Sequence, residues 1–453
     1  MREDKYTYEA TVNPFYSCNY NCSYCISRER LLPPGRGWSR EGLEKIVAFF
    51  NQRPETWRII LVGGEVTINP HFIWLCEQLT QRHGIDLVTN NSISFEKQEA
   101  FLAAVNNERI VRITCSLQSV DEEPERFEKF VQKIKKYQEH GIPVRVSYVA
   151  TPERIGKLQE YHSFFEKNNI TFLVQPLIGT HAGKEYPMQY DKEEYRILDE
   201  TIVSARLRAA IDGVASVFGK TCAKGHTQIV VNGDTGDIFG CNLDQLPVGN
   251  IYSGELSLLP APRNCIYNKC LCETEPATME IRALDRKEER KYENKPHLHY
   301  DHEIYKQIRK ASAPLENPER NFTEEEIAKL RLNDSFEKAK AAILAQKYLE
   351  GVELLRPFSS SEDNSSDFFY FYAVALVGSS DPANYAEAER FFAKALEKNY
   401  SEYWVCFQRG SLYIKMNRFD LAILDFEKAC ALDSTQGTAA GLPGLINELK
   451  AII

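Results

Sequence analysis

Three cysteines at short spacing lie near the start of the chain. Cys18, Cys22 and Cys25 follow the pattern C-x3-C-x2-C. Three thiolates on one loop can hold three irons of a [4Fe–4S] cluster and leave the fourth iron without a protein ligand. A fully ligated cluster needs a fourth cysteine nearby, and the next one along the chain is Cys76. A zinc knuckle is the alternative, because short cysteine spacings also suit Zn²⁺.

The elements that must position this loop alternate between strand and helix. The expected strands span residues 9–15, 57–62, 85–89, 110–116, 144–149 and 171–174. Repeated β-α units imply an α/β fold with a parallel sheet, which we expect to curl into a partial (β/α)6 barrel over residues 1–215. Ligands of such sheets bind at the carboxyl ends of the strands. The cysteine loop follows the first strand, so we expect it at this edge.

Further polar residues follow other strands of the same sheet. Gly63-Gly64-Glu65 comes after the second strand, Asn90 follows the third, and Ser116 ends the fourth. Glycines let a main chain approach a ligand closely, and a glutamate there can balance a cation. A glycine pair alone is common in loops, and Asn90 and Ser116 could simply cap strand ends.

The cysteine motif, with Tyr24 directly before its third cysteine, resembles the radical S-adenosylmethionine (SAM) superfamily, and so does the Gly-Gly-Glu turn. The resemblance implies that Cys18, Cys22 and Cys25 hold a [4Fe–4S] cluster whose open iron is chelated by SAM. Enzymes of this superfamily cleave SAM reductively to a 5′-deoxyadenosyl radical, which abstracts a hydrogen atom from the substrate.

The same resemblance implies which residues bind SAM. Tyr24 would pack near the adenine, and Gly63, Gly64 and Glu65 would face the methionyl amino group. Asn90 and Ser116 would contact the ribose or the carboxylate. No catalytic residue beyond these can be assigned from the sequence.

A second group of five cysteines lies in residues 216–275: Cys222, Cys241, Cys265, Cys270 and Cys272. Asn232-Gly233 between the first two indicates a hairpin. A cysteine, a hairpin and a late cysteine cluster resemble the SPASM extension or its shorter form, twitch, which bind auxiliary [4Fe–4S] clusters. Five cysteines are too few for two fully ligated clusters. We therefore expect one auxiliary cluster held by four of the five, with a structural zinc site as the alternative.

The last part of the chain repeats with a period of 34 residues. Four positions of one copy recur in the next: Tyr385, Ala388, Phe392 and Ala395, then Phe419, Ala422, Phe426 and Ala429. This period resembles tetratricopeptide repeats over residues 335–453, which would bind a partner protein or mediate dimerisation. A plain helical cap is the alternative. Residues 276–334 are rich in charge and are expected to form a partly helical linker.

Composition restricts the remaining classes. A chain of 453 residues should form two to four domains. The net charge of −9 argues against nucleic-acid binding, and no apolar run approaches the roughly 20 residues that span a membrane. The charged N-terminus lacks a signal peptide, so we expect a cytoplasmic protein. There, twelve cysteines favour metal binding over disulfides.

The expected function is a radical SAM enzyme of the oxidoreductase or isomerase type that modifies a ribosomally made peptide or protein. The SPASM-like extension and the repeats favour this substrate. The chain begins directly at the first strand, which leaves no room for a leader-binding domain and counts against it. The alternative is a dehydrogenase or epimerase of a sugar, aminoglycoside or other small metabolite. An electron donor such as flavodoxin or ferredoxin is expected, and a non-catalytic iron–sulfur scaffold is disfavoured by Glu65.

Overall fold

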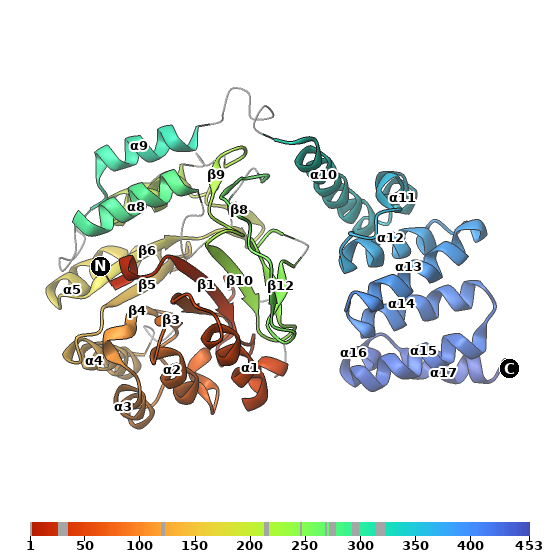
Figure 1. The fold of residues 1–453 in the computed structure, drawn as a ribbon, viewed down its shortest axis with the longest axis horizontal. Coiled ribbons are helices and arrows are strands. Elements are labelled where there is room, and N and C mark those ends of the chain that lie inside the picture. The colour runs from red at the N-terminus through yellow and green to blue at the C-terminus, as the bar shows by residue number, and fades with distance from the viewer. Residues whose placement is uncertain are drawn as a thin grey trace. The chain divides into compact units, whose positions relative to one another are not determined.

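The computed structural model describes residues 2–25, 35–118, 123–212, 217–244, 247–267, 270, 278–291, 299–313 and 322–453. The chain divides into two compact units, Met1–Asn321 and Phe322–Ile453. The first unit combines helices with a sheet, and the described part of the second is helical (Figure 1). The α/β sheet domain and the helical C-terminal region expected from the sequence are both confirmed.

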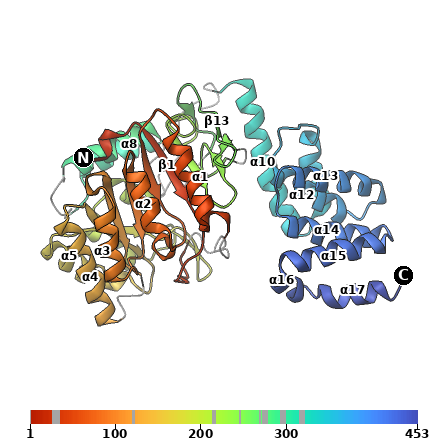
Figure 2. The same ribbon diagram turned by 60° about the horizontal axis from the view of Figure 1, so that its bottom comes forward.

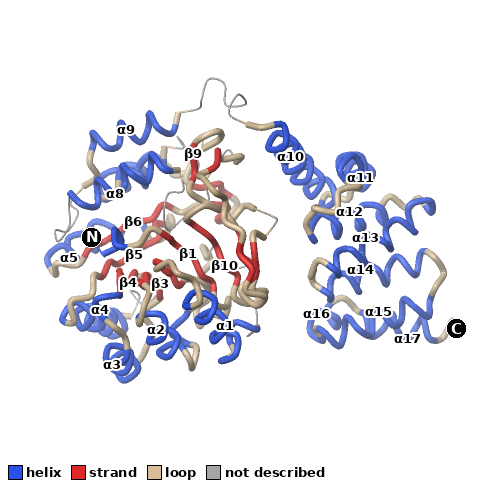
Figure 3. The backbone as a smooth tube through the Cα atoms, in the orientation of Figure 1, coloured by secondary structure: helices blue, strands red, loops and turns tan. Residues whose placement is uncertain are grey.

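A ten-stranded sheet forms the centre of the first unit (Figure 3). Its strand order is β13-β12-β11-β10-β1-β2-β3-β4-β5-β6. The six predicted strands are β1 (Tyr8–Asn13), β2 (Trp57–Leu61), β3 (Gly84–Thr89), β4 (Ile110–Ser116), β5 (Val144–Ala150) and β6 (Thr171–Pro176). They pair in parallel and in chain order, as predicted. Among the described strands, β13 and β6 form the two edges of the sheet, so this sheet is open.

Helices that alternate with these strands cover one face of the sheet (Figure 2). They are α1 (Arg40–Asn51), α2 (Phe72–Thr80), α3 (Phe95–Ala104), α4 (Pro124–Glu139) and α5 (Leu158–Lys167). All five residues of β2 are buried, as expected of a strand covered on both faces. In α1, Leu43, Ile46, Val47 and Phe50 follow the helical period and are buried in the same core.

Strands from the second cysteine region extend this same sheet. They are β10 (Gln228–Asn232), β11 (Asp237–Phe239), β12 (Gly249–Asn250) and β13 (Glu255–Leu256). β10 pairs in parallel with β1, and the following strands are antiparallel. The sequence indicated a separate small domain over residues 216–275. In the structure, these strands belong to the sheet and to the compact unit of the predicted barrel.

Short elements complete the first unit: β7 (Gly179–His181), β8 (Lys184–Tyr186), α6 (Lys192–Thr201), α7 (Ala205–Ile211), β9 (Thr221–Cys222), β14 (Arg263–Asn264), α8 (Met279–Lys291) and α9 (His302–Ser312). The last two helices fall in the expected linker. They contribute Ile281, Ile304 and Ile308 to the core of the sheet unit. The second compact unit begins at Phe322.

The second unit consists of packed helix pairs, α10 with α11, α12 with α13, and α14 with α15. Its helices are α10 (Glu324–Leu344), α11 (Tyr348–Leu355), α12 (Ser366–Gly378), α13 (Tyr385–Glu397), α14 (Glu402–Lys415), α15 (Phe419–Leu432), α16 (Ser434–Ala439) and α17 (Leu442–Lys450). The recurring alanines and Phe392 and Phe426 are buried. A Cβ at Gly410 would lie 2.5 Å from the Phe426 ring, so a small residue is needed where α14 meets α15.

Among the described helices, none combines the length and the apolar character needed to cross a membrane.

A buried carboxyl connects three helices of the first unit. Glu288 of α8 is 1% exposed and accepts hydrogen bonds from the main-chain N–H groups of Ala205 (2.9 Å) and Asp301 (2.7 Å). Ala205 begins α7, and Asp301 caps the N-terminus of α9. Burial raises the pKa of Glu288 to about 7, although these two hydrogen bonds oppose the rise. This carboxyl therefore titrates near neutral pH in the folded protein.

Replacing Glu288 by glutamine should change the pH dependence of stability. Between about pH 4.5 and 7, the folded protein keeps a proton on Glu288 that the unfolded chain releases. This carboxyl therefore lowers the free energy of unfolding as pH rises through that window, and its contribution is constant above it. Glu288→Gln should lack this decrease relative to wild type. Urea unfolding gives the free energy of unfolding at pH 5 and at pH 7.5. An equal change between these two pH values in wild type and variant would contradict the assignment.

Candidate functional site

The three N-terminal cysteines lie on one loop that follows β1. Cys18, Cys22 and Cys25 are half-buried, and the Cys25 N–H donates to the Cys22 carbonyl oxygen at 3.2 Å. Burial raises the pKa of the Cys18 thiol, and the charge of Cys25 adds to the rise. Burial also raises the pKa of Cys22, and both other cysteines add to it. The three thiols are therefore close enough to act on one another electrostatically.

The Gly63-Gly64-Glu65 turn packs directly against the main chain that leads into this loop. A Cβ at Gly64 would lie 1.9 Å from the Ser17 carbonyl oxygen, and one at Gly63 would lie 2.5 Å from that of Phe15. Gly63 also has φ +145°, which side chains rarely adopt. The Glu65 N–H donates to the Ser17 oxygen at 2.9 Å. Both glycines are thus required by contact between two main-chain segments of the protein itself.

The Glu65 carboxylate is 1% exposed and is surrounded by hydrogen-bond donors. One oxygen accepts from the Thr67 N–H (3.0 Å), the Thr67 hydroxyl (2.5 Å) and the Thr89 hydroxyl (2.6 Å). The other accepts from the Asn90 N–H at 2.5 Å. Burial raises the pKa of Glu65 above its ordinary value, although these hydrogen bonds oppose the rise. The carboxylate thereby joins the end of β2 to the end of β3.

Asn90 connects β3 to the cysteine loop. Its side-chain amide donates to Asn19 Oδ1 at 2.8 Å, and its Oδ1 accepts from the Ser92 N–H at 2.9 Å. Asn19 in turn donates to the Ser92 hydroxyl at 3.0 Å. Asn90 therefore caps the strand end and also positions a residue between the first two cysteines.

The end of β4 carries the other residue predicted to contact SAM. Ser116 is half-buried at the last position of the strand. Its neighbour Cys115 is fully buried within the hydrophobic core, as expected for a side chain on the opposite face. Ser116 is thus at the carboxyl edge, close in the chain to residues that contact the cysteine loop.

Two residues at this edge were missed by the sequence analysis. Arg154, after β5, donates to the Tyr24 hydroxyl at 2.7 Å and to the carbonyl oxygens of Leu117 (2.9 Å) and Gln118 (3.1 Å). The Cys22 thiol donates to Gln118 Oε1 at 2.8 Å. Both residues follow strands of the parallel sheet, so the rule that identified Asn90 could have found them.

The second cysteine group converges where β9 pairs with β14. Cys222 ends β9 and pairs with Arg263 of β14, which lies two positions before Cys265. Cys222 is buried, and the partly buried Cys265 and Cys270 pack against it. Burial, with a smaller contribution from the nearby Cys241 and Cys270, raises the pKa of Cys222 to about 11 and that of Cys265 to about 12. Four of the five predicted thiols are therefore neighbours.

The fifth, Cys272, lies outside the described residues. A salt bridge supports the other four: Arg263 donates to both carboxylate oxygens of Asp244, at 2.8 and 2.7 Å. The Asp244 N–H donates to the Cys241 carbonyl oxygen at 3.1 Å. This pair joins the Cys241 loop to β14, and neither residue was among those predicted from the sequence.

The two cysteine groups offer different numbers of thiol ligands. Within the described ranges, no three His, Cys, Asp or Glu side chains are gathered as ligands of a single metal ion. The first loop offers three half-buried thiols, and the Tyr20 N–H donates to Cys18 Sγ at 3.4 Å. The second offers four thiols. Thiolates in a hydrogen-bonded, partly buried setting are the donors that iron–sulfur clusters use.

Residues 12–164 match the family model described as the radical SAM superfamily. This segment begins in β1, includes the cysteine loop and the Gly-Gly-Glu turn, and ends in α5. It therefore carries a radical SAM domain. Comparison with curated proteins gives no match.

Several solved structures share a weak likeness with the chain. Native anSMEcpe with bound AdoMet and Cp18Cys peptide has a TM-score of 0.39 and 18% identity, covering 54% of this chain and 77% of that one. Streptococcus suis SuiB bound to precursor peptide SuiA has a TM-score of 0.36 and 19% identity, covering 51% and 59%. SeMet BtrN in an open conformation has a TM-score of 0.28 and 13% identity, covering 54% and 75%.

Replacing Gly64 by alanine should displace the cysteine loop. The new Cβ would meet the Ser17 carbonyl oxygen at 1.9 Å, and main chain cannot move aside as a flexible side chain can. We expect a loss of roughly 1–3 kcal/mol in the free energy of unfolding, measured with urea. Gly156→Ala is the matched control, because its Cβ would meet no atom within 4 Å. Equal stability of the two variants would refute the close contact.

Proposed function

We propose that this protein is a radical SAM enzyme that holds a [4Fe–4S] cluster through Cys18, Cys22 and Cys25. The observation that carries the proposal is the position of these thiols at the carboxyl edge of a parallel sheet, inside the segment that matches the radical SAM family model. When bound, the cluster would supply the electron for reductive cleavage of SAM, and SAM would supply the group that abstracts a substrate hydrogen.

The residues of this edge have distinct roles in the proposal. Gly63 and Gly64 bring the turn against the cysteine loop, and Glu65 keeps the turn attached to β3. We assign Tyr24 to the SAM adenine, with Arg154 holding the hydroxyl of that ring in place. Asn90 and Ser116 line the same edge and offer polar groups to the ribose or carboxylate. The buried Glu65 carboxylate acts in this scheme by positioning the main chain.

We further propose an auxiliary [4Fe–4S] cluster held by Cys222, Cys241, Cys265 and Cys270. The proximity of these four thiols supports the assignment. Arg263 and Asp244 would fix the loop that carries Cys241. This region would act as a SPASM- or twitch-like module, although its strands share the sheet of the radical SAM domain.

A ribosomally made peptide or protein is the proposed substrate, with an oxidation, epimerisation or cross-link as the outcome. Support comes from the auxiliary cysteine module and from the paired helices of the second unit, which we propose to be tetratricopeptide-like. Such pairs commonly bind peptides or proteins. A sugar or another small metabolite is the alternative substrate, since one auxiliary cluster would also suit it. Flavodoxin or ferredoxin is the proposed class of electron donor.

The catalytic assignment is tested by removing one proposed cluster ligand. Cys22→Ala should abolish formation of 5′-deoxyadenosine by anaerobically reconstituted, reduced enzyme with SAM. The control variant Cys430→Ala removes a thiol from the helical unit and should still form 5′-deoxyadenosine. Product formation by Cys22→Ala at the wild-type rate would refute the proposal. Stimulation of the wild type by host peptide fractions rather than small-molecule fractions would identify the substrate class.

The auxiliary assignment is tested by counting irons. A variant with Cys18, Cys22 and Cys25 all replaced by alanine should keep about four irons per chain after reconstitution. Adding Cys222→Ala to this triple variant should remove these irons, because Cys222 is a proposed ligand of the auxiliary cluster. Iron analysis and visible absorbance measure both. A folded triple variant without iron would refute the second cluster.

A further inference from the structure

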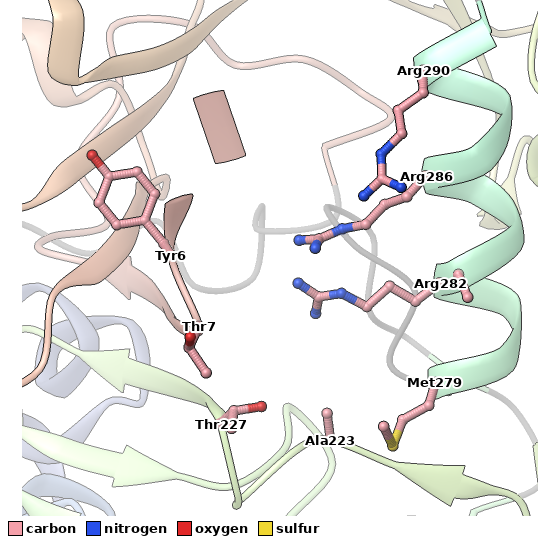
Figure 4. Close-up of a pocket in the computed structure, with 9 residues that line it drawn as sticks. Tyr6, Thr7, Ala223, Thr227, Met279, Arg282, Arg286 and Arg290 are labelled. Carbon is pink, nitrogen blue, oxygen red and sulfur yellow. The ribbon is translucent and has the colours of Figure 1, made fainter. Parts of the chain in front are cut away.

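A cavity of about 370 Å³ lies at the amino end of the parallel strands (Figure 4). Thr7 directly precedes β1 and Thr227 directly precedes β10, and both line the cavity. The cysteine loop follows the opposite end of β1, so a strand of six residues, about 20 Å long, separates the two places. The proposed radical chemistry makes no use of this cavity.

Three arginines of α8 form one wall of the cavity. Arg282, Arg286 and Arg290 are four residues apart, which places them on one face of the helix. Figure 4 shows their guanidinium groups side by side, extending from α8 toward Thr7 and the start of β1. Met279 begins the same helix and gives the cavity an apolar portion.

The carboxylates near these arginines are fewer than the arginines themselves. Asp4 pairs with Arg290 at 3.0 Å and lies 3.9 Å from Arg286. Glu9 pairs with Arg282 and lies 3.6 Å from Arg286. Glu9 also pairs with the buried Arg58 at 2.9 Å, so its charge is shared. In this described group, the positive charge exceeds the negative.

Arg286 is the least satisfied of the three. Its Nε and Nη2 atoms are buried, and no described group accepts a hydrogen bond from either. Both nearby carboxylates are beyond hydrogen-bond distance. A buried donor without an acceptor is costly, and native proteins usually supply a partner. Anionic oxygens in the cavity would supply one.

We propose that this cavity, the α8 arginine pocket, binds a small organic anion through a phosphoryl or carboxylate group. A guanidinium matches two oxygens of either group, and arginine is favoured for such pairing. The hydroxyls of Thr7 and Thr227 and the side chain of Met279 would contact the remainder of the ligand. The volume is within the range of small-molecule sites. The inference goes beyond the proposed function and does not rest on it.

Calorimetric titration of the full-length protein tests the proposal. Pyrophosphate and citrate, each at constant ionic strength, represent the two sources of anionic oxygens. We expect saturable binding of at least one probe at one site per chain, weakened by added salt. Binding of pyrophosphate alone would identify a phosphorylated ligand, and binding of citrate alone a carboxylate. Saturable binding of neither would overturn the proposal.

Variants locate the binding. Arg286→Gln should weaken it at least tenfold, whereas Lys287→Gln should change it less than twofold. Lys287 is exposed on the same helix, so the second variant makes the same change of net charge away from the pocket. Equal effects of the two variants would overturn the assignment.

A second variant separates ligand binding from a purely structural role of the arginines. Ala283 lines the pocket and is exposed, so Ala283→Leu should fill part of the cavity and leave the ion pairs intact. We expect at least tenfold weaker binding with an unchanged midpoint of thermal unfolding. This variant also keeps the proposal testable if Arg286→Gln fails to fold. Wild-type affinity in Ala283→Leu would show that the anion binds elsewhere.

Discussion

The candidate site depends on a contact between two pieces of main chain. The Gly63-Gly64 turn approaches the carbonyl oxygens of Phe15 and Ser17 so closely that neither glycine could carry a side chain. Glu65 then attaches this turn to the end of β3 through a fully buried carboxylate. The cysteine loop starts from Ser17, so these contacts within the protein set its position.

The same strands carry two polar networks, one at each end. At the carboxyl end, the buried Glu65 and the side chain of Arg154 join main-chain and polar groups around the cysteine loop. At the amino end, Arg58 is 1% exposed and pairs with Glu9 (2.9 Å) and Asp86 (2.5 Å), joining β1, β2 and β3. Buried charges are tolerated only when they are paired in this way. The cysteine site and the arginine-rich end, where the α8 arginine pocket lies, are thus at opposite ends of the same strands.

The second cysteine group is attached to the first through the sheet. β10 pairs with β1, and the Gly233 N–H donates to the Asn13 carbonyl oxygen at 2.7 Å, directly before the cysteine loop. Gly37 also donates its N–H to Asp234 at 3.0 Å. An extension built in this way shares the core of the radical SAM domain. A shift in the β10–β11 hairpin would therefore displace the main chain at the start of the cysteine loop.

The sequence by itself determined the elements and the candidate ligands. Apolar runs such as Trp57–Leu61 predicted the strands, and cysteine spacing predicted the first loop, because both patterns are local. Only the tertiary structure decided that β10 joins β1, that Arg154 reaches Tyr24, and that three arginines of α8 share two carboxylates. These contacts join residues more than a hundred positions apart. They arise from how twisted strands and helices pack, and no short-range pattern specifies them.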